Sequence, residues 1–136
     1  MPKLATRTVL TLEAAKEIMA AAEAEARKNS WAVSIAILDE GARLVMLQRL
    51  DGAPPASVDV CQAKARSAAL FRRPSKAFSD IVGGGRVGVM ALPGAIPVEG
   101  GLPLMAGGEC IGAIGVSGVT SEQDAQIGAA GAALLT

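Results

Sequence analysis

The sequence predicts one α/β domain of the α+β type over residues 1–136, with a mostly antiparallel five-stranded sheet covered by helices. Apolar residues recur every three or four positions over residues 12–28, which is typical of an amphipathic helix. Small and large residues alternate over residues 31–38, which is typical of a strand. The length of 136 residues suits a single core, and no linker or internal repeat divides it.

The first half of the chain reads as a helix followed by a hairpin. Thr11 can cap the helix over residues 12–28. The strand over residues 31–38 leads into a turn, in which Gly41 is available for a position with positive φ, and a second strand covers residues 43–49. Prolines then close the hairpin before the next helix.

The second half reads as two helices, three strands and a last helix. Ser57 can cap a helix that runs to residue 71, and a short helix follows over residues 75–81. Three apolar runs between Val87 and Gly118, separated by Gly and Pro, predict three strands, of which the last two cover residues 102–105 and 110–116. Thr120 and Gln123 form a capping box for the final helix.

The composition excludes several classes of partner. Lys and Arg number 13 and Asp and Glu also number 13, so there is no net charge to attract nucleic acid or an anionic membrane. Hydrophobic residues make up 51% of the chain but aromatic residues only 2%, which predicts a tightly packed aliphatic interior. A small, neutral and apolar domain also tends to associate, so we expect a homo-oligomer.

Location and cofactor content follow from what the sequence lacks. Cys61 and Cys110 are too isolated for a disulfide framework, and no apolar run is long enough to span a bilayer. The first residues do not read as a secretory signal, so we expect a cytoplasmic protein. Without histidine the usual haem ligand, zinc ligand and near-neutral base are absent. We therefore expect no metal site and no cofactor.

Three polar side chains are candidates for a ligand site. Arg49 and Asp51 close a strand and open a loop, where a rigid element presents side chains to a pocket. Alternatively, Asp51 caps the turn and Arg49 pairs with it. Lys64 lies at the border of an apolar helix face, where it either anchors a carboxylate in a cleft or stays solvated. Cys61 on the same helix is either ordinary packing or a remaining haem ligand.

Glycine-rich segments supply the other candidates. Gly84, Gly85, Gly100 and Gly101 expose backbone N–H groups that suit a carboxylate or a polar head group. Glu99 lies in an apolar setting that would raise the pKa of its carboxyl group toward the range useful for proton transfer, unless it is an ordinary loop glutamate. Ser117 has no activating base, which argues against a serine hydrolase.

Five segments in a fixed order resemble the GlcG/HbpS family, which includes haem-degrading proteins and the PduO C-terminal-like domain. They are Arg49–Ala53, Lys64-Ala65, Gly100–Pro103, Gly112–Gly118 and Gln123-Asp124. The resemblance implies a sheet-and-helix fold and an oligomer that is often octameric. It also implies a small-molecule role that differs between members, from haem binding or degradation to accessory or hydrolytic partners in catabolic operons.

These observations predict a homo-oligomer that binds a small unsaturated or carboxylated metabolite of a catabolic pathway. Arg49 and Lys64 would hold the acid. Glu99 or Asp51 would carry the proton if the protein is a cofactor-free hydrolase, deaminase or isomerase. Two alternatives remain open at this point: a non-catalytic haem or tetrapyrrole binder, and an accessory oligomer without a ligand.

Overall fold

The computed structural model describes residues 1–135 and contains a four-stranded antiparallel sheet in the order β2-β1-β4-β3. The elements are α1 (Leu12–Lys28), β1 (Ser34–Asp39), β2 (Leu44–Arg49), α2 (Ala56–Phe71), α3 (Lys76–Gly83), η1 (Val87–Ala91), β3 (Gly101–Ala106), β4 (Glu109–Ser117), α4 (Ser121–Ala132) and η2 (Ala133–Leu135). Strands from both halves of the sequence share this sheet, so the chain forms one α+β domain.

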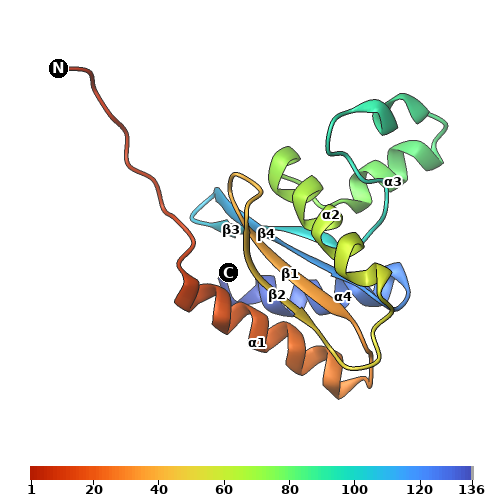
Figure 1. Ribbon diagram of the computed structural model, residues 1–136. Coiled ribbons are helices and arrows are strands. Elements are labelled where there is room, and N and C mark those ends of the chain that lie inside the picture. Colours follow the sequence, from red (N-terminus) through yellow and green to blue (C-terminus); the bar gives the residue numbers. More distant parts are fainter. Residues whose placement is uncertain (136) are drawn as a thin grey trace.

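Helices cover both faces of the sheet. Figure 1 shows α1 and α4 on one face and α2 on the other. The alternation predicted for β1 explains this arrangement, because large side chains project to one face and small ones to the other. Ile35 and Ile37 join the core beneath α1 and α4, whereas Ser34 and Ala36 face α2.

The face beneath α2 is built from small residues, which brings this helix very close to β4. A Cβ atom on Gly115 would lie 2.0 Å from the carbonyl oxygen of Cys61 and 2.6 Å from the backbone nitrogen of Ala65. Glycine is therefore required at this position for steric reasons. Ala68, Ala69 and other small residues continue the same packing, so α2 contacts the strands nearly backbone to backbone.

The expected helix caps are present at α1 and α4. The Thr11 hydroxyl accepts a hydrogen bond from the backbone N–H of Ala14 at 3.1 Å. Thr120 and Gln123 make both bonds of the capping box. The hairpin between β3 and β4 turns at residues 107–108, as the sequence predicts.

The prediction of five strands is wrong, because the sheet within residues 1–135 has four. The first of the three apolar runs forms the 3₁₀ helix η1 and a loop. Pro93, Gly94 and Pro97 explain the difference, since proline lacks a ladder donor and glycine disfavours extended structure.

One helix cap and one turn also differ from expectation. Ser57 does not cap α2, because the helix already begins at Ala56. Its hydroxyl instead donates to the carbonyl of Pro54 and contacts Ser34 Oγ at 2.8 Å. In the first hairpin the positive φ falls on Ala42, at 63°, and not on Gly41. The Asp39 carboxylate explains this, because it accepts hydrogen bonds from the N–H groups of Gly41 and Arg43 and fixes the turn.

Two segments extend beyond the layered body. Residues 1–11 form an arm that leads away from it, and α3, η1 and their loops, residues 76–99, form a limb on the other side (Figure 1). Among residues 1–135 no helix combines the length and apolar character needed to cross a bilayer.

We predict that Gly115→Ala destabilises the fold by about 3 kcal/mol or more, because the added methyl group would overlap the backbone of α2. Gly88→Ala is the matched control, since nothing lies within 4 Å of a Cβ atom there. It should change stability by less than about 0.5 kcal/mol. Urea denaturation of both variants measures the difference, and equal midpoints would contradict the close approach of α2.

Candidate functional site

Among the described residues, the two buried charged side chains are those of Lys64 and Asp124, and Lys64 lies on the inner side of α2. Its side chain is 2% exposed, so it lies neither in solvent nor at the mouth of a cleft, the two surroundings considered from the sequence. Nζ donates to Asp124 Oδ2 at 3.0 Å and to the Val116 carbonyl at 2.9 Å. The ligand role predicted for Lys64 stays a prediction, and it would require the pair with Asp124 to open.

Asp124 is the functional-looking residue that the sequence reasoning missed. It lies in the first turn of α4, where an acidic side chain interacts favourably with the helix dipole, and its carboxylate is also only 2% exposed. Oδ1 accepts from the backbone N–H of Val119, so both oxygens are used. Burial raises the pKa of this carboxyl group, and the hydrogen bond and charge of Lys64 oppose the increase. The pattern that could have revealed Asp124 is its spacing from Ile127, Gly128 and Gly131, which are buried on the same face of α4.

Gly100 and Gly101 lie directly on Lys64. A Cβ atom on Gly100 would lie 2.7 Å from Lys64 Nζ, and one on Gly101 would lie 2.2 Å from the Lys64 carbonyl oxygen. The N–H of Gly101 donates to Ser75 Oγ at 2.9 Å, so it is already satisfied inside the protein. The structure thus brings together three of the predicted ligand-binding residues, in a packed interior.

Arg49 and Asp51 lie at the same end of the sheet, where Arg49 is paired with Ser34 and Ser34 with Ser117 in the strand register. The Arg49 guanidinium does not pair with Asp51. It donates from Nε and Nη2 to the carbonyl of Ala53 at 3.1 and 2.8 Å and so closes the loop after β2. Three of the five guanidinium donors remain available for a ligand.

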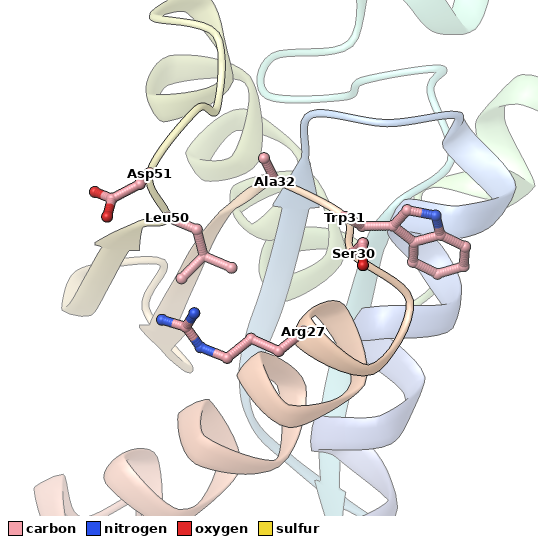
Figure 2. A pocket seen from close by; sticks show the side chains of 6 residues that line it. All are labelled: Arg27, Ser30, Trp31, Ala32, Leu50 and Asp51. Atoms are coloured by element: carbon pink, nitrogen blue, oxygen red, sulfur yellow. The ribbon is translucent and has the colours of Figure 1, made fainter.

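Asp51 borders the largest pocket described, an open depression of about 230 Å³ between the end of α1 and the loop after β2. Its lining residues are Arg27, Ser30, Trp31, Ala32, Leu50 and Asp51. Figure 2 shows Arg27 and Asp51 on either side of Leu50, whereas the ring of Trp31 is turned away from both. This pocket combines a cation, a carboxylate and an apolar floor.

Glu99, Gly84 and Gly85, the remaining candidate residues, do not line that pocket. Glu99 is half-buried next to Gly100 and close to the exposed ammonium of Lys76. The hydrogen bond and charge of Asp80 raise the pKa of Lys76, and the charge of Glu99 adds to the effect. Gly84 and Gly85 are exposed at the end of α3, where a Cβ atom would meet no crowding; Gly85 has a φ of 96°.

The Cys61 thiol is not activated as a nucleophile. Burial raises the pKa of the Cys61 thiol to about 12, and its Sγ donates to the carbonyl of Val58. A protonated, buried thiol is a poor nucleophile and a poor metal ligand. Within residues 1–135 no three Cys, Asp or Glu side chains come together as a metal site would require.

We predict that Lys64→Met and Asp124→Leu each destabilise the protein by about 3–5 kcal/mol, because each leaves the partner's charge buried and unpaired. The double variant should lose less than the sum of the two single losses, by about 0.5–3 kcal/mol. Chemical denaturation of the four proteins gives this coupling energy. Strict additivity would mean that the two side chains do not interact.

Comparisons with known proteins identify the family of the chain. The model of a family described as "Haem degrading protein HbpS-like" matches residues 10–133. Protein GlcG of Escherichia coli K12 is 43% identical over 112 residues, which cover 82% of this chain and 84% of that protein.

Solved structures show the same fold. The crystal structure of Klebsiella pneumoniae protein ORFY has a TM-score of 0.91 and 31% identity, and the alignment covers 99% of this chain and 96% of that one. A double mutant of Streptomyces reticuli HbpS has a TM-score of 0.88 and 34% identity, over 98% and 91% of the two chains. The family model and the GlcG match together establish that this chain belongs to the GlcG/HbpS family.

Proposed function

We propose that the protein is a homo-oligomer that binds a small organic acid without converting it. The observation that carries this proposal is the state of the buried reactive groups. Lys64 and Asp124 neutralise each other, and the Cys61 thiol is held protonated. General acid–base or nucleophilic catalysis requires a group that is free to exchange a proton or attack a substrate, and none of these three is.

The pocket beside Asp51 is our candidate for the acid. Arg27 supplies a cation there, although Glu23 already accepts a hydrogen bond from its Nε at 2.7 Å, and Leu50 supplies an apolar surface. Arg49, at the start of the same loop, retains free donors that can form a charge-assisted bond to a carboxylate. Asp51 and Glu99 would be the proton carriers only if turnover were found.

Exposed apolar side chains support self-association. They occur on the arm, on β2, on the outer side of α2 and on the limb: Leu4, Val9, Leu44, Leu47, Val60, Val87, Met90, Leu92 and Val98. Surface of this kind on a chain without net charge favours contact between copies. The family resemblance adds an octamer as the expected assembly. Light scattering tests this directly, because a mass near 13.7 kDa at micromolar concentration would exclude it.

Ligand binding is measurable by isothermal titration calorimetry. Titration with short saturated and unsaturated carboxylates should give a saturable binding isotherm. Arg49→Ala should weaken binding about 5- to 150-fold, the loss of a charge-assisted hydrogen bond of about 1–3 kcal/mol.

Arg43→Ala is the matched control, since Arg43 is also exposed but precedes the other end of β2. The Arg43→Ala variant should bind the carboxylate with the affinity of the wild type. Proton NMR of the mixture during the titration reports turnover, and the appearance of product resonances would replace the binding function by a catalytic one. No binding heat with any carboxylate would reject the acid as the ligand.

Haem is the second candidate ligand, because the family model is described by a haem-degrading protein. Imidazole ligation is excluded by the absence of histidine, and burial keeps the Cys61 thiol protonated, which leaves Cys110 as the accessible thiol. We predict no sharp Soret band at one haem per chain when haemin is titrated. Such a band in the wild type that disappears in Cys110→Ser would establish a thiolate haem site and reverse the order of the two candidates.

A further inference from the structure

The charged side chains that line the pocket beside Asp51 lie on opposite sides of an apolar floor. Figure 2 shows the Arg27 guanidinium and the Asp51 carboxylate on either side of the Leu50 side chain. Ala32 adds a second apolar side chain to the lining. A ligand in this pocket therefore meets a positive group on one side, a negative group on the other and apolar surface between them.

The charges in and beside this pocket cancel one another. Arg27 pairs with Glu23 at 2.7 Å, and Lys28, the other basic residue in the last turn of α1, also pairs with a glutamate of that helix. Arg49 at the end of β2 and Asp51 in the following loop add one charge of each sign. The C-terminal end of α1 contributes a partial negative charge. A ligand that is only an anion would leave this region with a net negative charge.

Asp51 is the charged side chain of this set that has no partner. Glu23 accepts hydrogen bonds from Arg27 and Gln48, and Arg49 donates to a backbone carbonyl. Within the part of the chain that the structure describes, Asp51 makes no side-chain hydrogen bond or ion pair. A carboxylate only accepts hydrogen bonds, and a cationic donor such as an ammonium group gives it the strongest one. The pocket thus offers a site for a positive group.

Ser30 adds a hydroxyl group to the lining of the pocket. Its φ is 59°, in the left-handed region, where a helix that ends in this way usually has glycine. The N–H groups of Ser30 and Trp31 donate to the carbonyls of Arg27 and Ala26, so the helix end explains the conformation but not the serine. The hydroxyl has no partner among the described residues. A hydrogen bond to a polar end of a ligand would explain why serine is present.

We infer that the ligand of this pocket is an ω-amino carboxylate, a short apolar chain with a carboxylate at one end and an ammonium group at the other. The carboxylate binds the terminal nitrogens of Arg27, because the hydrogen bond to Glu23 uses Nε, together with the Arg49 donors already assigned to it. The ammonium group binds Asp51, and the methylene groups cover Leu50. This inference rests on the acid-binding function proposed above and names the class of acid.

Four probes with the same four-carbon chain separate the contributions of the two charges. They are 4-aminobutyrate, butyrate without the ammonium group, 1-aminobutane without the carboxylate, and 2-aminobutyrate with both charges at one end. In calorimetric titrations of the wild type, 4-aminobutyrate should bind roughly 5- to 150-fold more tightly than butyrate, which is the gain from one charge-assisted hydrogen bond. It should also bind more tightly than 1-aminobutane and 2-aminobutyrate.

Each departure from this order has a distinct meaning. Equal affinity for butyrate and 4-aminobutyrate would overturn the ammonium site and leave the proposed acid binding in place. Tighter binding of 2-aminobutyrate would overturn the separation of the two charges across Leu50. Equal affinity for 1-aminobutane and 4-aminobutyrate, or binding heat from none of the four probes, would overturn the acid-binding function itself and the inference with it.

Asp51→Asn tests the residue that should hold the ammonium group. The variant should bind 4-aminobutyrate no more tightly than butyrate, and its affinity for butyrate should not fall. Asp59→Asn is the matched control, because Asp59 is an exposed acidic residue in the first turn of α2 that does not line the pocket. It should keep the preference of the wild type. A preference of wild-type size in Asp51→Asn would overturn Asp51 as the ammonium site.

Ser30→Gly separates a ligand contact of the hydroxyl group from a purely structural role. Glycine adopts this φ without strain, so the midpoint of urea denaturation should not fall. The affinity for 4-aminobutyrate should nevertheless decrease, because a hydrogen bond to the ligand is lost. An unchanged affinity would overturn the contact between Ser30 and the ligand.

Discussion

The ion pair between Lys64 and Asp124 connects the two helical layers of the molecule. It joins α2 on one face of the sheet to α4 on the other, at the end of β4, where the Val116 carbonyl accepts a second bond from the ammonium. Removing two charges from water is costly, and this arrangement offsets the cost because both carboxylate oxygens have partners. Gly100 and Gly101 then follow by necessity, because a side chain at either position would collide with Lys64.

This pair also limits the chemistry that the interior can support. Lys64 and Asp124 together resemble the acid and base of an active site when only their residue types are considered. In the structure each fixes the other, and Gly100 covers the ammonium so that no substrate atom has room beside it. Members of a fold family can differ in function when their ligand contacts lie in loops and the interior keeps the architecture. Here Arg49 ends β2 and Asp51 lies in the loop that follows it.

Patterns among neighbouring residues were sufficient to predict α1, β1 and the N-terminal cap of α4. The stripe of α1, the capping box of α4 and the alternation in β1 each involve residues within a few positions of one another. The failures concern distant partners. The run around Val87 is apolar enough for a strand, but Pro93 and Pro97 follow it closely, and the run forms η1 and a loop instead. Lys64 and Asp124 are 60 positions apart, so neither residue's local pattern identifies its partner.

The small side chains that draw α2 onto the sheet also restrict where the proposed ligand would bind. With Gly115 and Ala65 in contact and few aromatic side chains, the interior leaves no internal cavity for a metabolite among the pockets described. The largest is an open depression of about 230 Å³, below the roughly 300–1,000 Å³ of sites that enclose a ligand. Enclosure therefore requires a second surface over the pocket beside Asp51. A second copy in the proposed oligomer would supply that surface and would couple ligand affinity to the oligomeric state: a variant that dissociates the copies would then weaken binding without altering Arg49 or Asp51.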